Sequence, residues 1–336
     1  MTIDWIITNG KQQMTTQKLK MKILANDGID PVGQQMLEAA GFTVDTKNIP
    51  QDELPARLNE YDVITVRSAT KVRQALIDAC PNLKVIGRGG VGMDNIDVEY
   101  AREKGLAVYN TPASSSLSVA ELVFAHLFTG IRFLYDSNRR MPVEGTTKFN
   151  DLKKAYAKGI ELRGRTIGIL GFGRIGREVA KIAIGLGMDV LAYDLFPFNP
   201  EVEIVLGGGG TKVNVNVQTA TLEEIIAKAD FITLHTPFIE KPILGAEEFE
   251  KVKKGVAIVN CSRGGLIDEQ ALINALDSGK VAFAGLDVFD NEPTPLEALL
   301  KHPKVSLTPH IGAATGEAQE RIGTELAGLI ISHFKQ

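Results

Sequence analysis

The sequence predicts an α/β protein with two doubly wound domains, each built on a parallel sheet. Short β-branched runs alternate with helical patterns from residue 20 to 110, and a second series of the same kind begins after Gly164. Strands that are each followed by a helix are typical of βαβ units, which build parallel sheets. A length of 336 residues also favours two domains, because a domain commonly has about 100–200 residues.

The composition excludes several classes of protein. Apolar residues make up 44% and charged residues 23% of the chain, which is typical of globular domains and not of disordered, collagen-like or membrane proteins. The net charge of −4 argues against binding to nucleic acid. No stretch approaches about 18 uninterrupted apolar residues, so we expect no membrane span. The 33 glycines are an excess that indicates many tight turns.

The ends and the cysteines set further expectations. Cys80 and Cys261 are too few for a disulfide framework or a zinc site, so we expect a reducing, cytoplasmic location. The first residues do not pair a basic segment with an apolar one and are not interpreted as a signal peptide. We expect residues 1–19 to form a loosely ordered extension.

In the first half, the predicted elements follow one another closely. A strand is expected at residues 20–26 and a helix at 31–41, with proline at its start and glycine at its end. Strand and helix patterns then alternate to residue 110. Residues 116–140 contain one glycine and no proline, and their apolar positions predict one long amphipathic helix.

The second half repeats the pattern. A strand at residues 166–171 is followed by a helix at 174–185, and further strand and helix patterns continue to a closing helix at 315–334. We infer that this closing helix returns to the first domain, which is then discontinuous. Residues 201–221 interrupt the alternation with four consecutive glycines and alternating Val and Asn, which predicts an exposed hairpin. It is interpreted as a flexible surface insertion, with a lid or a partner arm as the alternative.

A glycine motif predicts a dinucleotide site. Gly171, Gly173 and Gly176 form G-x-G-x-x-G between a predicted strand and a predicted helix, which is the context that makes this motif specific. The first glycine permits a tight turn, the second a close approach of a pyrophosphate, and the third close packing of helix and strand. The start of the helix offers free N–H groups to the phosphates.

Asp194 completes this fingerprint, 18 residues after Gly176. Its carboxylate is expected to accept hydrogen bonds from the adenosine ribose. A 2′-phosphate placed at about 4 Å would be repelled by up to about 4 kcal/mol at an effective dielectric constant of about 20. The sequence therefore predicts NAD in preference to NADP, with Arg174 directed at the pyrophosphate.

The five histidines can be sorted by their surroundings. We expect His126 to be packed within its helix, while His302 lies in a polar turn and His333 near the end of the chain. His235 ends a strand and is expected to line the nucleotide pocket. His310 also follows a strand, and its ordinary pKa near 6.5 suits proton exchange with an alcohol. Position alone leaves open whether it is a general base or an ordinary residue at a strand end.

Charged residues follow two other strands of the same half. Arg263 follows VAIVNCS, and Glu292 follows GLDVFDN, with Asp287 at the end of that strand. An arginine can clamp a substrate carboxylate, and a carboxylate beside a histidine fixes its tautomer. Three such groups at the ends of successive strands are not explained by surface charge alone.

Four motifs stand in the order and spacing of a known family: GFGRIG with Asp194, NCSRGGLID, GLDVFDNEP and PHIGAAT. From residue 20 on, the chain resembles the D-isomer-specific 2-hydroxyacid dehydrogenases. The resemblance implies a Rossmann NAD-binding domain, residues 116–311, inserted in a flavodoxin-like substrate domain, residues 20–115 and 312–336. It implies that His310 accepts the hydroxyl proton, Glu292 holds the imidazole, and Arg263 binds and polarises the oxo-acid.

The same resemblance implies NAD as the cofactor and a set of residues that contact it, with Asp287 at the nicotinamide amide. These residues are Gly171, Gly173, Arg174, Ile175, Gly176, Asp194, His235, Thr236, Pro237, Cys261 and Asp287.

Within the family, VRSATKV, GRGGVGMDNID and NTPASSSLSVAE resemble most the members that oxidise 3-phospho-D-glycerate, the first step of serine synthesis. The substrate-binding residues so implied are Arg67, Ser68, Gly90, Val91 and Asn110. Arg67 is the best candidate for the substrate phosphate, ahead of Lys47 and Lys154. Because the chain stops at Gln336, we expect a short form without a C-terminal regulatory domain.

Two alternatives stay open. Some members with similar motifs reduce glyoxylate or hydroxypyruvate, and some relatives of the fold are NAD-sensing transcriptional corepressors. The resemblance also implies a homodimer in which the helix at 116–140 and the nucleotide domain form the interface. No metal and no nucleic-acid or membrane partner is expected.

Overall fold

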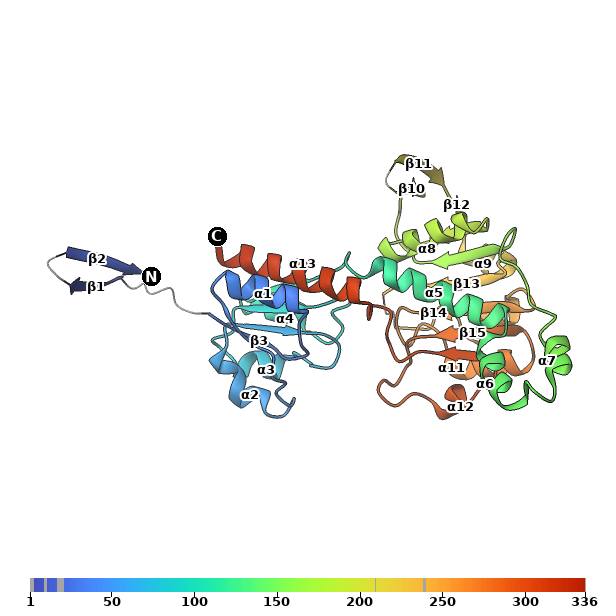
Figure 1. The fold of residues 1–336 in the computed structure, drawn as a ribbon, viewed down its shortest axis with the longest axis horizontal. Coiled ribbons are helices and arrows are strands. Elements are labelled where there is room, and N and C mark those ends of the chain that lie inside the picture. Colours follow the sequence, from blue (N-terminus) through green and yellow to red (C-terminus); the bar gives the residue numbers. More distant parts are fainter. Residues whose placement is uncertain (1–2, 9–10, 17–20, 209, 238–239, 336) are drawn as a thin grey trace. The chain divides into compact units, whose positions relative to one another are not determined.

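The computed structural model describes residues 3–8, 11–16, 21–208, 210–237 and 240–335 (Figure 1). The chain divides into two compact units. Unit 1 comprises Met1–Ser115 and Thr315–Gln336, and unit 2 comprises Ser116–Ala314. The chain therefore returns to unit 1 at Thr315, and not at residue 312 as the sequence suggested.

Unit 1 is built on a parallel five-stranded sheet with the strand order β4-β3-β5-β6-β7. This is the flavodoxin-like order that the family resemblance implied. The strands are β3 (Lys22–Ala25), β4 (Thr43–Asp45), β5 (Val63–Val66), β6 (Val85–Arg88) and β7 (Ala107–Asn110).

Helices cover both faces of this sheet. One face packs against α1 (Pro31–Ala39) and α13 (Gly316–Lys335) through residues such as Leu37 and Leu326. A Cβ built on Gly33 would lie 2.5 Å from the carbonyl oxygen of Gly323, so α1 and α13 touch backbone to backbone. The other face packs against α2 (Leu54–Arg57), a 3₁₀ turn (Leu58–Glu60), α3 (Gln74–Ala79) and α4 (Val98–Glu103).

The predicted N-terminal extension contains a hairpin. Strand β1 (Ile3–Thr8) pairs antiparallel with β2 (Lys11–Thr16), with Ile3 opposite Thr16. Positions 1–2, 9–10 and 17–19 of the expected loose extension lie outside the described residues.

Unit 2 is built on a parallel seven-stranded sheet with the order β12-β9-β8-β13-β14-β15-β16. This is the Rossmann order with one further strand. The strands are β8 (Thr166–Leu170), β9 (Asp189–Tyr193), β12 (Gln218–Thr219), β13 (Phe231–Leu234), β14 (Val256–Asn260), β15 (Val281–Leu286) and β16 (Val305–Leu307).

Two apolar clusters fill the two faces of this sheet. One cluster packs against α5 (Ser116–Ile131) and α8 (Arg174–Gly185). The bounds of α8 match the helix predicted at residues 174–185. The other cluster packs against α9 (Leu222–Lys228), α10 (Ala246–Lys251), α11 (Glu269–Asp277) and α12 (Glu297–Leu300).

The prediction of one helix over residues 116–140 is wrong. The chain forms α5, then α6 (Leu134–Glu144), bent by 53°, and then α7 (Phe149–Ala155). Phe133, between α5 and α6, has a left-handed backbone (φ 53°). The physical reason is burial, since α5 packs its apolar residues on the sheet whereas α6 buries none of its residues. Gly130 is the last residue but one of α5, and no proline lies within residues 116–140.

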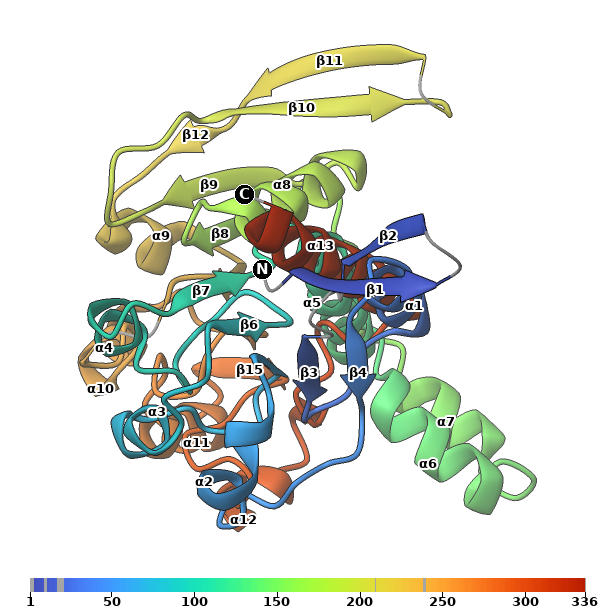
Figure 2. The same ribbon diagram turned by 90° about the vertical axis from the view of Figure 1, so that its left-hand side faces the viewer.

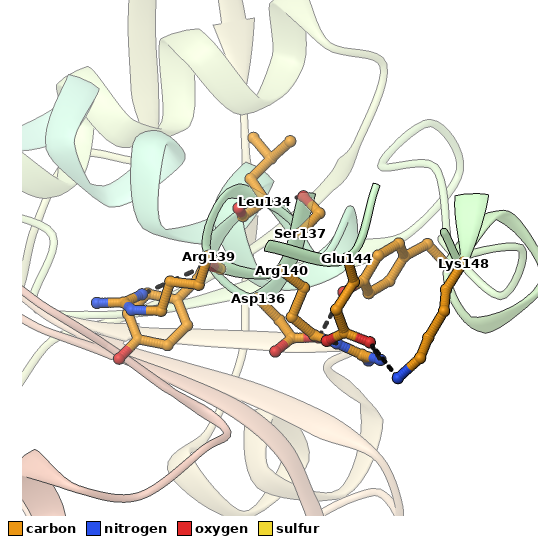
Figure 3. A network of polar contacts seen from close by, with 9 residues as sticks. Leu134, Asp136, Ser137, Arg139, Arg140, Glu144 and Lys148 are labelled. Atoms are coloured by element: carbon orange, nitrogen blue, oxygen red, sulfur yellow. Dashed lines mark hydrogen bonds and ion pairs between the residues drawn. The ribbon is translucent and has the colours of Figure 1, made fainter. Parts of the chain in front are cut away.

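Helix α6 is braced by charged side chains instead (Figure 3). Glu144 accepts hydrogen bonds from Arg140 at 3.0 Å and from Lys148 at 3.2 Å. Tyr156 donates to Asp136 at 2.6 Å and so ties α6 to the residue after α7. In the part of the chain that the structure describes, no single helix has the length and apolar composition of a membrane span; α5 and α6 meet that test only as a bent pair.

The hairpin predicted in the glycine-rich insertion is confirmed. Strand β10 (Glu201–Leu206) pairs antiparallel with β11 (Thr211–Asn216) and extends beyond the edge of the sheet at β12 (Figure 2). Val202 is buried in the cluster under α8, whereas Val205 and Leu206 near the tip are about half exposed.

Candidate nucleotide and active site

The glycine turn after β8 has no room for side chains at two of its three glycines. Gly171 has φ +100°, and a Cβ there would lie 2.5 Å from the carbonyl carbon of His235. A Cβ on Gly176 would lie 2.2 Å from the carbonyl oxygen of Gly171. A Cβ on Gly173 would meet nothing within 4 Å, so the space beside this backbone is open. Gly171 and Gly176 are therefore required for steric reasons, whereas the backbone at Gly173 leaves space for a ligand.

The start of α8 fits an anionic ligand. Gly173 is its N-cap, and no side chain in the described residues caps it. The first N–H groups of a helix lack partners within the helix and carry the positive end of its dipole. Arg174 is exposed at this end and Ile175 is half-buried beside it. A pyrophosphate group would find both N–H donors and a guanidinium here.

Asp194 lies directly after β9 and braces the glycine turn. Its carboxylate accepts hydrogen bonds from the backbone N–H of Phe172 at 2.7 Å and of Phe196 at 3.2 Å. A carboxylate offers about four lone-pair sites, so two remain for the hydroxyl groups of a ribose.

The segment after β13 holds buried polar atoms that lack partners. The Nε2 atom of His235 lies 2.9 Å from the hydroxyl of Thr233, but in the described residues its Nδ1 has no partner, nor has the hydroxyl of Thr236. Burial lowers the pKa of His235 to about 3, so the ring is neutral. Leaving such atoms unpaired is costly, so they are available to hydrogen-bond a ligand at the carboxyl end of β13. Pro237, next in the chain, is exposed.

Asn260 shapes the loop that carries Arg263. Its amide donates to the carbonyl of Arg263 at 2.7 Å and accepts from the N–H of Ser262 at 3.0 Å. The hydroxyl of Ser262 donates to the carbonyl of Thr236 at 2.8 Å, which joins this loop to the segment after β13. Asn260 was not singled out from the sequence, although an amide at a strand end beside a charged residue is a usable signal.

Cys261, in the same loop, is buried. Burial, and then the charge of Asp287, raise the pKa of its thiol well above the ordinary value, so the thiol is neutral. Both cysteines of the chain are free and buried. Within the described ranges, no three His, Cys, Asp or Glu side chains gather in a way that could hold a metal ion.

His310 and Glu292 are paired. The Nδ1 atom of His310 lies 2.8 Å from a carboxylate oxygen of Glu292, whose other oxygen accepts from the N–H of Phe289 at 3.1 Å. A neutral ring must then carry its proton on Nδ1, so Nε2 is left as a proton acceptor. His310 has a left-handed backbone (φ 55°), which is uncommon for a residue with a side chain and occurs often at functional sites.

Arg263 completes this group. Burial of Glu292 favours a higher pKa, but the hydrogen bond and charge of His310, the N–H of Phe289 and the charge of Arg263 together lower it. Arg263, Glu292 and His310 follow the adjacent strands β14, β15 and β16. The structure thus brings the three predicted catalytic residues to one edge of the sheet.

Asp287 directly follows β15 and is almost fully buried. It accepts hydrogen bonds from the Thr308 hydroxyl at 2.6 Å and from the N–H groups of Ile311 and Gly312, each at 2.8 Å. Burial raises its pKa in spite of these bonds. A carboxylate so oriented has a fixed position from which to meet a ligand.

The predicted substrate residues lie in unit 1, at the carboxyl edge of its sheet. Arg67 and Ser68 follow β5, Gly90 and Val91 follow β6, and Asn110 ends β7. The amide of Asn110 donates to the carbonyl of Val91 at 2.6 Å.

Asp27 and Asn95, which no sequence pattern indicated, support this edge. Asp27 accepts from the N–H groups of Arg67 at 2.7 Å and Thr70 at 3.1 Å, and from the hydroxyl of Thr70 at 2.6 Å. Asn95 donates to the carbonyls of the same two residues at 2.8 and 2.6 Å. The loop that presents Arg67 is therefore held at both of its ends.

The chain has clear similarity to characterised proteins. A family model described as the NAD binding domain of D-isomer specific 2-hydroxyacid dehydrogenases matches residues 124–312. Over 319 residues the chain is 43% identical to D-3-phosphoglycerate dehydrogenase of Homo sapiens, covering 94% of this chain and 56% of that protein. It is 42% identical over 321 residues to hydroxypyruvate reductase of Thermotoga maritima, covering 94% and 99% of the two chains.

A solved structure agrees with the fold. A glyoxylate reductase from Paecilomyes thermophila matches with a TM-score of 0.78 at 29% identity, covering 95% of this chain and 96% of that one. The chain spans about half the length of the mammalian relatives that it matches.

Proposed function

The chain belongs to the D-isomer specific 2-hydroxyacid dehydrogenase family, and on this premise we propose that it oxidises 3-phospho-D-glycerate to 3-phosphohydroxypyruvate with NAD. In a cell this reaction would begin serine synthesis. The observation that carries the chemistry is the 2.8 Å contact between His310 and Glu292, with the charge of Arg263 beside it. The identity to D-3-phosphoglycerate dehydrogenases supports the choice of substrate.

The pair of His310 and Glu292 handles the proton. With Nδ1–H directed at Glu292, the Nε2 atom of His310 accepts the proton of the substrate hydroxyl, and the imidazolium formed is stabilised by the carboxylate. The guanidinium of Arg263 binds the oxygens of the acid. Bound NAD supplies the acceptor for the hydride that leaves the substrate carbon.

The residues present fit NAD. The open space at Gly173 and the start of α8 suit the pyrophosphate, and Asp194 suits a ribose that carries free hydroxyl groups. The backbone of His235 and Thr236 lies beside Gly171, and the buried side-chain atoms of these two residues that have no partner among the described residues suit the rest of the nucleotide. Asp287 has the fixed carboxylate expected at the nicotinamide amide.

Arg67 is proposed to bind the substrate phosphate, with Ser68, Gly90, Val91 and Asn110 contacting the acid. The test is an assay of NADH formation on phosphorylated and plain 2-hydroxy acids, with Arg67→Ala beside the wild type. We expect Arg67→Ala to raise KM for 3-phosphoglycerate at least tenfold and to change KM for an unphosphorylated acid much less. An unchanged KM for the phosphorylated acid would refute the phosphate assignment.

The second candidate is reduction of hydroxypyruvate or glyoxylate. The observation that favours it is the 42% identity to hydroxypyruvate reductase over nearly the whole of both chains. Higher kcat/KM for these oxo-acids with NADH than for the phosphorylated acid would select it. A protein that binds NADH and turns over none of the acids would instead favour the NAD-sensing binding protein.

We also propose a homodimer in which α5, α6 and the nucleotide-binding unit contribute the interface. Helix α6 buries none of its residues, and Leu134, Met141 and Val143 are exposed on it. Light scattering after size-exclusion chromatography tests this, since a mass near 36 kDa would show a monomer. A reducing, cytoplasmic location stays a proposal supported by the two free, buried cysteines, and localisation of a tagged chain tests it.

A further inference from the structure

His126 connects helix α5 to the active-site edge of unit 2. It lies on the face of α5 that packs on the sheet, and its exposed fraction is 2%. A Cβ built on Gly285 of β15 would lie 2.6 Å from the Cβ of His126, so helix and strand are in close contact at this point. The ring reaches β16 and the residue that follows it, where it meets Ser306 and Thr308.

The direction of each hydrogen bond in this group can be assigned. The Thr308 hydroxyl lies 2.6 Å from Asp287, and an ionised carboxylate only accepts, so this hydroxyl donates to Asp287. Its oxygen must then accept from Nε2–H of His126 at 3.0 Å. In the neutral ring Nδ1 is an acceptor, so the hydroxyl of Ser306 donates to it at 2.9 Å. Burial lowers the pKa of His126 to about 4, which keeps the ring neutral near pH 7.

The chain of bonds continues into the loop that carries His310. The Oδ1 atom of Asp287 accepts hydrogen bonds from the Thr308 hydroxyl and from the N–H of Ile311. Its Oδ2 atom accepts one from the N–H of Gly312. The backbone N–H of His310 donates to the carbonyl of Asp287 at 2.8 Å. The orientation of the Asp287 carboxylate and the course of this loop therefore depend on each other.

We propose that His126 is a positioning residue for the nicotinamide end of the site, acting through Thr308 on the carboxylate of Asp287. The donor at Nε2 holds the Thr308 hydroxyl in the one orientation that points its proton at Asp287. Without that donor the Thr308 hydroxyl has other orientations open to it, and the carboxylate is held less firmly by one of its three hydrogen bonds. The inference rests on the proposed function, which places Asp287 at the nicotinamide amide.

If His126 had only a structural role, its substitution would have a different effect on ligand binding. A packing or stability defect would weaken every ligand of unit 2 alike, whereas misplacement of Asp287 concerns only the nicotinamide. ADP-ribose contains the adenosine and pyrophosphate of NADH but lacks the nicotinamide. The ratio of the dissociation constants of NADH and ADP-ribose therefore separates the two roles.

The experiment measures both dissociation constants by fluorescence and calorimetry for the wild-type chain, four single variants and one double variant. His126→Leu and Thr308→Val each remove the link to Asp287, and we expect about a tenfold weaker binding of NADH with ADP-ribose binding changed less than about twofold. His126→Gln, which keeps one donor and one acceptor, should restore most of the NADH affinity. Ser306→Ala is the matched control, since it removes only the bond at Nδ1 and should bind NADH like the wild type.

The double variant of His126→Leu and Thr308→Val should be no worse than either single variant, because both act on one path. Equal losses for NADH and ADP-ribose, or unchanged NADH binding in Thr308→Val, would overturn the proposal. If His126→Leu fails to fold, His126→Phe takes its place, because its ring also lacks a donor for Thr308. If the wild type oxidised no 2-hydroxy acid, the proposed function would be refuted. The ratio of the dissociation constants of NADH and ADP-ribose would still decide whether His126 positions Asp287, because it needs no turnover.

Discussion

The two sheets differ at the point where their strand order reverses. In unit 2 the loop after β8 is the turn from Gly171 to Gly173, and the facing segment after β13 has buried atoms of His235 and Thr236 without partners in the described residues. In unit 1 the corresponding loop after β3 carries Asp27, whose carboxylate is bonded to Arg67 and Thr70 of the loop after β5.

This difference shows how one architecture serves two purposes. Ligands of doubly wound sheets bind where the strand order reverses, beyond the carboxyl ends of the strands. In unit 2 this position has polar side-chain atoms of His235 and Thr236 and an accessible backbone at Gly173, which suit a nucleotide. In unit 1 the side chain of Asp27 crosses the corresponding place and bonds to the next loop. Together with a bond from Asn95, it holds the loop that carries Arg67. We therefore expect substitutions in unit 2 to affect chemistry and cofactor binding, and those in unit 1 to affect binding of the acid.

The largest effect is expected at the active-site edge of unit 2. His310→Gln removes the proton acceptor, and general base catalysis contributes about 10²–10⁴-fold, so kcat should fall by that factor while NADH still binds. Steady-state kinetics and fluorescence titration of NADH measure the two quantities. A kcat within about threefold of the wild type would contradict the role assigned to the pair with Glu292.

The glycine turn offers a matched pair of substitutions. Gly173→Ala adds a methyl group where the space is open, so the melting temperature should hold while NADH binds about tenfold more weakly. Gly176→Ala places a Cβ 2.2 Å from the carbonyl oxygen of Gly171, so both the melting temperature and the affinity should fall. If both variants changed the melting temperature and the NADH affinity to the same extent, the different roles assigned to Gly173 and Gly176 would be wrong.

In unit 1, Asp27→Ala releases the loop of Arg67. One hydrogen bond to a carboxylate contributes about 1.5–3 kcal/mol, so loss of three should lower the free energy of unfolding by at least that amount. It should also raise KM for the acid several-fold, with NADH affinity unchanged. The control is Asp97→Ala, which removes bonds to Arg73 and Gln74 at the start of α3. It should cost stability without raising KM, and a rise in both variants would indicate general damage to unit 1.

The smallest effect is a pH dependence from the buried histidines of unit 2. The pKa of His126 is lowered to about 4 from its usual value near 6.5, so between these pH values the unfolded chain binds a proton that the folded chain does not. Stability should therefore rise with pH across this window, by at most about 1.4 kcal/mol per pH unit. Urea unfolding at pH 5 and 7 should show a smaller difference in His126→Gln than in the wild type. An identical difference in both would exclude this contribution.

Local sequence was sufficient for much of this protein. The bounds of α8 follow from the glycine motif and from a regular apolar pattern, and both sheets follow from the alternation of short strands and helices. Arg263, Glu292 and His310 were singled out because parallel strands place their carboxyl ends at a common edge, whereas Arg67 and the other residues at strand ends in unit 1 were implied by the family resemblance. These features depend on backbone conformation and periodicity within about 20 residues.

The break at Phe133, the clamp of Asp27 and the partners of His126 were decided only by tertiary structure. Asp27 binds residues 40 and 43 positions away, and His126 binds residues 180 and 182 positions away. The sequence indicated that His126 is packed in its helix, and this is confirmed, but not that its ring touches the active-site edge. Such pairings arise from how a helix is seated on a sheet, which no local pattern encodes.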